Sequence, residues 1–454
     1  MPALDNDSHA IVIGGSMGGL LAARVLADRY QQVTILERDE FPAIGEHRRG
    51  VPQGRHTHGL LASGRDVLER LFPGISNDLI AAGAIAGDIV QNARWCNEGG
   101  LLARFQSGLN GLLMTRPLLE GTVRHRVLAL SNVVARQGFH VEALTVSEDR
   151  KRVTGVKDKG TELHADLVID TTGRGSSSPQ WLEAIGYPKP VEERVEVALA
   201  YTTRFFRRHR SQLNGDVVVI VPPTPQGKRG GVMLAQEGDR WTVTLIGHFG
   251  QAAPTDVPGF VEYARTLPAP YIHEVVRESE PVSEPMTARF PASMRRRYER
   301  LERFPEGFLV FGDAISSFNP IYGQGMSVAA LEAMELQAVL AESSGNLARR
   351  FFRRAAKVVD MPWSVSVGND LRMPETVGPR NAGVSFINWY MVKLNKAAQK
   401  DPVPAMAFFR VANLLAPPPS VMHPKVVWRV LIANLRRPLP DGRGSDQSRD
   451  RKER

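Results

Sequence analysis

The sequence of 454 residues contains one cysteine, Cys96. A single cysteine excludes a disulfide framework within the chain, a zinc site made of cysteines and a redox-active Cys-x-x-Cys pair. Cysteine-poor composition also suits the reducing cytoplasm, which is the location we expect. Long hydrophobic runs are lacking too: the longest uncharged apolar stretch, residues 10–23, ends at Arg24. It is shorter than the ~18 residues of a membrane-spanning helix, and the polar start of the chain is unlike a signal peptide.

Acidic residues are in the minority, since 57 basic and 48 acidic side chains give a net charge of +9. The basic excess gathers in residues 204–210, 294–303 and 348–357. These clusters are either solvated helix faces or a surface for an acidic partner, such as an anionic membrane face or an acidic carrier protein. Because no nucleic-acid-binding module accompanies them, we expect no nucleic-acid partner. The sequence predicts no particular oligomeric state.

What is present is the composition of an ordinary globular protein, with 43% hydrophobic and 23% charged residues. The length predicts about two or three domains. Residues 8–37 have the pattern strand, glycine-rich turn, helix, strand. In the turn GGSMGG, Gly14 and Gly19 occupy the first and third glycine positions of the GxGxxG pattern, and Ser16 stands at the second.

This opening is typical of a dinucleotide-binding unit. The first glycine permits a tight turn, the third permits close packing of helix and strand, and the helix N-terminus attracts a diphosphate. Glu37 ends the second strand, where an acid usually binds a ribose hydroxyl. The alternative is a structural βαβ unit with incidental glycines. One such unit does not show whether the bound dinucleotide is NAD or FAD.

A second glycine-rich turn lies far along the chain. The apolar strand 308–311 stops at Gly312-Asp313, and a loop with Pro320, Gly323 and Gly325 leads into an alanine-rich helix. FAD is long, so a second turn is needed at its flavin end. Asp313 can accept a hydrogen bond from a ribityl hydroxyl, and the helix N-terminus can face the edge of the flavin that becomes negative on reduction. The second turn therefore favours FAD.

The sequence resembles the group A FAD-dependent monooxygenases, which have the para-hydroxybenzoate hydroxylase-like fold, nearest the branch of epoxidases and geranylgeranyl reductases. The resemblance covers roughly residues 8–345. It is carried by VIGGSMGGL (12–20), ILERD (35–39), MTRPLLE (114–120), ADLVIDTTGRGS (165–176) and FGDAISSFNPIYGQGMS (311–327).

The resemblance implies an α/β fold with a discontinuous Rossmann-like FAD-binding domain, an inserted antiparallel β-sheet substrate domain and a C-terminal helical region. The expected ranges are 1–189 and 296–345 for the FAD domain, 190–295 for the sheet, 346–438 for the helices and 439–454 for a disordered tail. Prolines in the helical region, Pro362 among them, are expected to act as breaks.

It also implies the cofactor-binding residues. They are Gly14, Gly15, Gly18 and Gly19 at the diphosphate, Glu37 at the ribose, Arg38, Arg49 and Arg116 near the FAD phosphates or ribityl chain, Asp313 at the ribityl or diphosphate region, and Pro320, Gly323, Gln324, Gly325 and Met326 at the flavin ring. Asp170 and Gly173 are shared between domain structure and the reducing nucleotide.

The segment 46–61, EHRRGVPQGRHTHGLL, offers Arg48, Arg49 and Arg55 as the arginine that this family places near the flavin. His56 and His58 lack further ligands at metal spacing, so we expect no metal site. The loop either contacts FAD or is a plain surface loop.

No second GxGxxG stands in a strand–helix context, because GKRGG (227–231) lies in the sheet region. NAD(P)H is therefore expected as a transient reductant. The resemblance implies a monooxygenase, an epoxidase or a hydroxylase, that uses O₂ through a C4a-hydroperoxyflavin on a hydrophobic polyketide, terpenoid or aromatic substrate. No catalytic residue is assigned: an alkene needs no general base, and a base for a phenol is not evident. An ene-reductase of the geranylgeranyl reductase type and a non-enzymatic prenyl-lipid carrier are the alternatives. A halogenase is less favoured, because a WxWxIP-type motif is lacking.

Three further features stay open. The aromatic residues after position 345 either close an apolar cavity or form core. The basic amphipathic segment 426–438 faces either the core or a membrane surface. Tyr201 and Arg204 are candidates to reach the site from the sheet domain.

Overall fold

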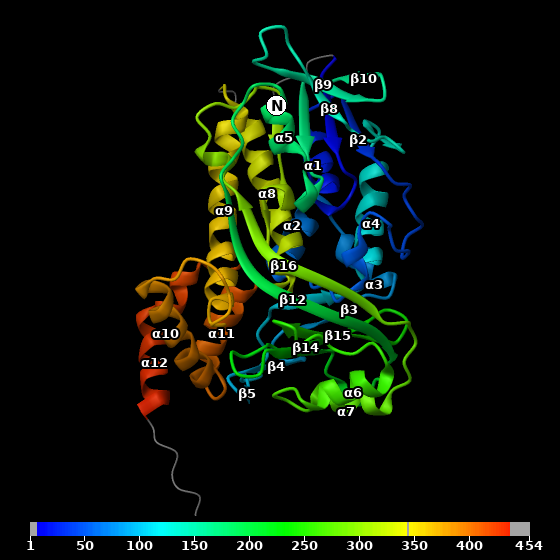
Figure 1. Ribbon diagram of the computed structural model, residues 1–454. Helices are drawn as coiled ribbons and strands as arrows, with labels where there is room; N and C mark the ends of the chain where they lie inside the picture. Colours follow the sequence, from blue (N-terminus) through cyan, green and yellow to red (C-terminus); the bar gives the residue numbers. More distant parts are fainter. Residues whose placement is uncertain (1–6, 343–344, 436–454) are drawn as a thin grey trace, which may run out of the picture.

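The computed structural model describes residues 7–342 and 345–435 (Figure 1). The tail predicted at 439–454 lies outside the described residues. Two large sheets and a set of helices make up the fold, and the fold class expected from the sequence is confirmed.

The first sheet is five-stranded and entirely parallel, in the order β17-β11-β1-β2-β7. Its strands are β1 (His9–Ile13), β2 (Gln32–Glu37), β7 (Val133–Gln137), β11 (Leu167–Asp170) and β17 (Phe308–Val310). Ala10, Ile11 and Val12 are fully buried because the apolar run of β1 occupies the centre of this sheet. The carboxyl ends of all five strands lie at one edge, and both glycine-rich turns follow strands that end there.

Helices pack around the parallel sheet. They are α1 (Met17–Leu26), α2 (Ala62–Leu71), α3 (Ile75–Ala81), α4 (Arg116–Leu128), α5 (Ser178–Ala184) and α8 (Gly325–Ala341). A three-stranded meander of β8 (Ala143–Val146), β9 (Val153–Asp158) and β10 (Thr161–His164) lies beside them at the top of Figure 1. Helix α1 packs on both α4 and α8, so the helices that follow the two turns are neighbours.

The second sheet has eight strands in the order β18-β16-β12-β15-β14-β13-β4-β5. Their bounds are β4 (Ala93–Asn97), β5 (Gly100–Leu101), β12 (Glu192–Arg207), β13 (Val218–Val221), β14 (Arg229–Gln236), β15 (Arg240–His248), β16 (Met286–Arg296) and β18 (Ser316–Ser317). It is antiparallel except for the β13–β4 pair. Strands β4, β5 and β18 come from outside the range 190–295, so three segments of the chain build this sheet.

Helices α6 (Val257–Arg265) and α7 (Tyr271–Glu278) cover the far face of this sheet, below it in Figure 1. They bury Phe260 and Ile272 against Trp241 and were not expected from the sequence. Strands β3 (Ile85–Asp88) and β6 (Asn110–Leu113) form a small separate pair. The domain ranges themselves stay a prediction.

The C-terminal part is helical, with α9 (Leu347–Asp370), α10 (Ala382–Ala398), α11 (Pro402–Ala412) and α12 (Pro424–Leu435). The expected break at Pro362 is wrong, because α9 continues through it. Phe351, Phe352 and Val359 on α9 are buried in the main core, and this tertiary packing outweighs the backbone hydrogen bond that a proline loses.

Candidate functional site

The first turn is held in a conformation that needs glycine. Gly14 has φ of 101°, and a Cβ there would lie 3.1 Å from Thr171 Oγ1. A Cβ on Gly19 would overlap the carbonyl oxygen of Gly14. The Thr171 hydroxyl donates to the carbonyl oxygen of Ile13 at 2.7 Å and lies 3.0 Å from that of Gly14, so the end of β11 is attached to the turn.

A buried network of ion pairs lies directly beside this turn. Arg48 pairs with Glu37 (2.6 Å) and with Glu120 (2.8 Å), and it also donates to the carbonyl oxygen of Gly15 (2.8 Å). Arg116 pairs with the other oxygen of Glu120 at 2.9 Å. All four charged side chains are buried. Two guanidinium groups and two carboxylates therefore neutralise one another next to the α1 N-terminus.

The charges of this network are mutually supporting. Burial alone would raise the pKa of Glu120, but Arg116 and Arg48 hold that pKa below its ordinary value. Ser16 belongs to the same network: its hydroxyl donates to Glu120 at 2.9 Å and accepts from Arg116 at 3.1 Å. The serine at the second glycine position is thus a polar link between the turn and α4.

The three predicted arginines have different surroundings in the structure. Arg116 lies at the turn, as described above. Arg38 is exposed and lies 3.6 Å from Asp39, and Arg49 is exposed as well. Their neighbour Arg48, which the sequence offered as an alternative, is the arginine that reaches the turn. Adjacent loop residues point in different directions, and the sequence carries no signal that separates Arg48 from Arg49.

Glu37 bonds to the protein through both carboxylate oxygens. Its Oε2 accepts from the amide of Gly15 at 2.8 Å, and its Oε1 accepts from the amide of Asp39 at 3.1 Å. Its expected role as ligand of a ribose stays a prediction.

The second turn follows β17. Gly312 has φ of 67°, and its amide donates to Glu332 of α8 at 2.8 Å. A Cβ on Gly325, the first residue of α8, would lie 3.5 Å from Asp313 Oδ1. Asp313 is exposed to solvent. The surrounding protein nevertheless raises the pKa of its carboxyl by desolvation, and Arg116 and Arg174 partly offset that rise. The carboxyl group of Asp313 is thus accessible to solvent and yet surrounded by protein atoms.

The two turns are contiguous in space. Thr171 contacts the first turn, and two residues later Gly173 approaches the second: a Cβ on Gly173 would lie 3.8 Å from the Asp313 Cβ. Arg116 pairs with Glu120 at the first turn and influences Asp313 at the second. The edge of the parallel sheet therefore joins both turns through the loop after β11. Asp170 itself is buried and accepts bonds from Thr172 and Ser176, so it shapes this loop.

The loop before α8 has the geometry of a cradle for a polar ligand. Gly323 has φ of 65° and is preceded by a short 3₁₀ turn, Pro320–Tyr322. Gln324 is buried, and its Oε1 has no hydrogen-bond partner among the described residues. Met326 is buried in the first turn of α8, whose leading amides have no intrahelical acceptor. An orphaned amide oxygen, free backbone donors and the Asp313 carboxylate are a donor and acceptor set that fits the ribityl chain and flavin of FAD.

The loop with His56 and His58 lies between the two sheets. His56 Nδ1 is 2.8 Å from the hydroxyl of Thr203, and its ring lies 5.4 Å from the ring of Tyr201. Burial lowers the pKa of both histidines to about 4. Among the described residues there is no group of three side chains suited to hold a metal. Tyr201 thus lies beside this loop, whereas Arg204 donates to the carbonyl oxygen of Ser283.

A buried carboxyl group that the sequence did not indicate lies behind the second turn. Asp370, at the end of α9, accepts from Asn319 Nδ2 (2.9 Å) and from the Tyr322 hydroxyl (2.7 Å). Its other oxygen has no partner among the described residues, and burial raises its pKa to about 7. The contact is purely tertiary, so no local pattern could have revealed it.

Apolar side chains pack together between the second turn and the eight-stranded sheet. Leu199, Tyr201 and Ile246 of that sheet form one cluster with Val367 and Leu371 of α9. Half-buried members of the same cluster are Ile321 of the loop, Phe290, Trp363 and Val384. The protein on this side of the second turn is therefore apolar.

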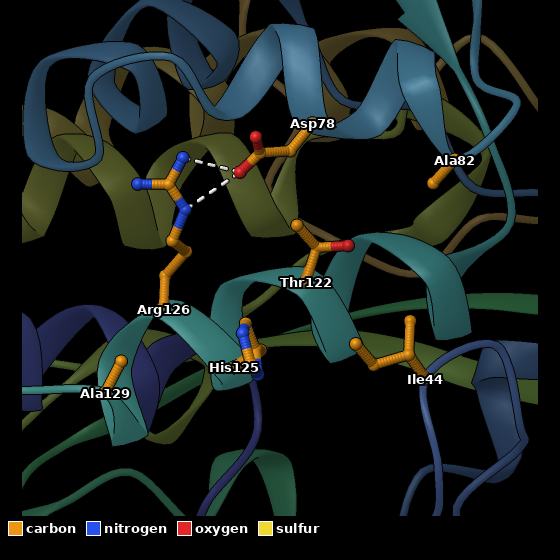
Figure 2. Close-up of a pocket in the computed structure, with 7 residues that line it drawn as sticks. All are labelled: Ile44, Asp78, Ala82, Thr122, His125, Arg126 and Ala129. Atoms are coloured by element: carbon orange, nitrogen blue, oxygen red, sulfur yellow. Dashed lines mark hydrogen bonds and ion pairs between the residues drawn. The ribbon is translucent and has the colours of Figure 1, made fainter.

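A cavity of about 530 Å³ lies elsewhere, between α3, α4 and Ile44 (Figure 2). Arg126 and Asp78, which line it, form an ion pair at 2.5 Å. Figure 2 marks this pair with dashed lines. None of the predicted site residues lines it, and we assign it no role.

Solved structures place this fold in a known class. The flavin-dependent brominase Bmp2 superposes with a TM-score of 0.66 at 12% identity, covering 94% of this chain and 99% of that one. The p-nitrophenol 4-monooxygenase PnpA from Pseudomonas putida superposes with a TM-score of 0.62 at 16% identity, covering 90% and 98%. PqsL from Pseudomonas aeruginosa, a probable FAD-dependent monooxygenase, gives 0.61 at 17%, covering 84% and 100%. The chain has the fold of the FAD-dependent monooxygenases, as the sequence indicated.

Sequence comparison then gives the family. The chain is 35% identical over 459 aligned positions to Protein Rv3254 of Mycobacterium tuberculosis, an alignment that covers 94% of each chain. It belongs to the same family as that protein. A shorter match, 23% identical over 170 residues, is to the chloroplastic zeaxanthin epoxidase of Oryza sativa subsp. japonica and covers 36% of this chain and 25% of that enzyme. No family model matches the sequence.

The described residues include no helix with the length and hydropathy of a membrane span.

Proposed function

We propose that this protein is an FAD-dependent monooxygenase, an epoxidase or hydroxylase, that acts on a hydrophobic small molecule with O₂ and is reduced transiently by NAD(P)H. The observation that carries the proposal is the junction of the two turns. Gly14–Gly19 and Asp313–Gly325 follow strands of one sheet, at one edge, with Thr171 and Gly173 between them. A single elongated cofactor can span that edge.

The residues at each end suit the corresponding part of FAD. The α1 N-terminus and the guanidinium groups of Arg48 and Arg116 would hold the diphosphate. Asp313 would accept from the ribityl chain. The loop 320–326 would hold the flavin ring, with the α8 N-terminus toward the edge of the ring that gains negative charge on reduction.

Bound FAD would supply the redox chemistry, which is the activation of O₂ by the reduced cofactor. The chain's own part is to bind, orient and exclude water. The apolar cluster of Leu199, Ile246 and Leu371 on the sheet side would hold a hydrophobic substrate and keep water away from the reacting atoms.

The titratable groups on this side favour an acceptor that needs no deprotonation. His56 and His58 have pKa values of about 4 and are uncharged and weakly basic at neutral pH. The Tyr322 hydroxyl is already hydrogen-bonded to Asp370 and Asn369. An alkene reacts without a base, so epoxidation is the form of the activity that we favour, and the match to zeaxanthin epoxidase supports it.

The test begins with the purified protein. We expect the visible absorbance of oxidised flavin, and NAD(P)H-dependent consumption of O₂ that becomes coupled when the substrate is present. Incubation of a cell extract with the protein, NADPH and ¹⁸O₂, followed by mass spectrometry, should reveal a product with one labelled oxygen. Product formed only without O₂ would indicate a flavin-dependent reductase instead, and a colourless protein that cannot be loaded with FAD would indicate a carrier.

A further inference from the structure

Both exposed tryptophans lie in the C-terminal helical part of the chain. Of six tryptophans in the sequence, Trp389 on α10 and Trp428 on α12 are 56% and 64% exposed, whereas the other four are buried or half-buried. Two fully surface tryptophans on adjacent helices are unusual for side chains that proteins normally bury. The helices form an outer corner of the molecule, at the lower left of Figure 1.

Further large apolar side chains are exposed on the same two helices. Phe386 and Ile387 on α10, and Leu431 and Leu435 on α12, are also exposed. The Phe386 and Trp389 rings lie 5.9 Å apart. Helices α10 and α12 pack on one another, and the side chain of Asn434, next to Leu435, donates to the carbonyl oxygen of Lys393 at 3.0 Å. We call these six exposed residues the apolar corner.

The interior of the same helix pair shows that the apolar corner is additional to the core. Tyr390 and Leu394 of α10 and Val426 and Val430 of α12 are buried in one cluster between the helices. The exposed aromatic residues are therefore not needed for packing within this part of the fold, and they leave an apolar surface of the kind that marks an interaction site.

The charged residues of the segment that carries the apolar corner are mostly basic. Between residues 382 and 435 there are six lysines and arginines and one acidic residue, Asp401, which lies 3.4 Å from Arg429. Lys393 and Lys396 continue the helical stripe of Phe386 and Trp389, since the successive spacings are three, four and three residues. The surface thus combines aromatic residues with positive charge.

We propose that the apolar corner docks on an anionic lipid bilayer. Tryptophan is favoured at the interface between lipid and water, and lysine and arginine are attracted to anionic headgroups. The contact would be peripheral, because no described helix has the character of a membrane span.

Two other occupants fit less well. A second copy of this chain would bring two positively charged surfaces together, on a protein whose net charge is already +9. The chain's own residues 436–454 contain a single large apolar side chain, Leu439, and seven basic residues against four acidic ones. They lack the apolar area to cover the corner.

Vesicle binding tests this proposal directly. The full chain is sedimented with vesicles of phosphatidylcholine alone and of phosphatidylcholine with phosphatidylglycerol, at low and at raised salt. We expect binding to the anionic vesicles that weakens with salt, and a blue shift of tryptophan emission. The measurement is made with and without FAD, so that a failure to bind flavin does not affect it.

Variants then locate the contact. Trp389→Ala with Trp428→Ala, and separately Lys393→Glu with Lys396→Glu, should each weaken binding at least about tenfold. Ile80→Ser with Val282→Ser, at exposed apolar positions on other parts of the surface, should leave it unchanged. The proposal is overturned if the native chain does not bind anionic vesicles, or if the tryptophan variant binds as well as the native chain. It is equally overturned if gel filtration shows a dimer that the tryptophan variant dissociates while vesicles are not bound.

Discussion

The two glycine-rich turns carry opposite electrostatic environments. At the first turn, Glu37 and Glu120 are buried but paired with Arg48 and Arg116, and the pKa of Glu120 is lowered. At the second turn, burial raises the pKa values of Asp313, Glu332 and Asp370, in the last two cases to about 8 and about 7. One end of the site is rich in compensated charge, and at the other end burial shifts the pKa values of the acids upward.

This difference matches the two halves of the proposed cofactor. A diphosphate is anionic and needs guanidinium groups and helix amides, which the first turn provides before any ligand binds. A flavin is largely apolar, carries polar edges and becomes negative only on reduction, so fixed anions beside it would oppose reduction. Raised pKa values keep that end closer to neutral.

The substitution with the largest expected effect is Gly19→Ala at the first turn. The added Cβ would overlap the carbonyl oxygen of Gly14, and backbone of α1 or β1 would have to move. We expect FAD content to fall to a small fraction of the native value, together with a clearly lower melting temperature. Gly175→Ala is the matched control, because a Cβ there meets nothing within 4 Å. A native flavin content in Gly19→Ala would contradict the assigned turn.

Removal of a charge from the ion-pair network at the first turn should destabilise the protein nearly as much as Gly19→Ala. Glu120→Gln leaves Arg116 buried without its carboxylate, which we expect to lower the free energy of unfolding of the FAD-free protein by about 3 kcal/mol. Chemical denaturation measures this change in the free energy of unfolding. Glu342→Gln, in an exposed ion pair, is the control and should change the stability very little. FAD should stabilise Glu120→Gln at least as much as the native protein, since the diphosphate supplies the missing anion. Less stabilisation by FAD would place the diphosphate elsewhere.

At the other end, Asp313→Ala should weaken FAD binding about ten- to hundredfold. The reason is the loss of one hydrogen bond to a charged group, roughly 1.5–3 kcal/mol. Flavin released at graded protein dilution measures the effect, and Asp149→Ala on an exposed loop is the control. Equal affinity in Asp313→Ala and the native protein would remove Asp313 from the site.

The last prediction is a pH dependence of stability that arises at the second turn. The folded-state pKa of Asp370, about 7, lies above its unfolded value of 3.8, so the folded protein binds the proton more tightly. Stability should therefore fall as pH rises from about 4 to about 7, by about 1 kcal/mol for each pH unit from this group. In Asp370→Asn this part of the decline should be absent, and Glu332 and Asp313, whose pKa values are also raised, contribute to the decline that remains. If the free energy of unfolding changed with pH in the same way in the variant and the native protein, Asp370 would not have the raised pKa.

The sequence predicted those parts of the site that depend on local pattern. Both turns follow from strand, glycine and helix signals within about thirty residues, and the parallel sheet follows from their repetition. The pair Arg116–Glu120 also had a local signal, the i,i+4 spacing on a helix, that could have identified Glu120. The strands β4 and β5, which join the eight-stranded sheet from a distant segment, had no such signal.

What escaped prediction is set by tertiary contacts. Arg48 rather than Arg49 reaches the first turn because of the path of one loop, and Asp370 meets Tyr322 only because α9 continues through Pro362 and brings its end to the second turn. Single residues in loops and at the ends of long helices obtain their surroundings from the whole fold.

The central claim is that one FAD molecule joins both turns. A crystal structure of the FAD-loaded protein tests it most directly. The account predicts continuous cofactor density from the amides of Gly14–Gly19, past Arg48 and Asp313, to the loop at Pro320–Gly325. Density that occupies one turn and leaves the other in contact with solvent, or a flavin bound at any other surface, would contradict it.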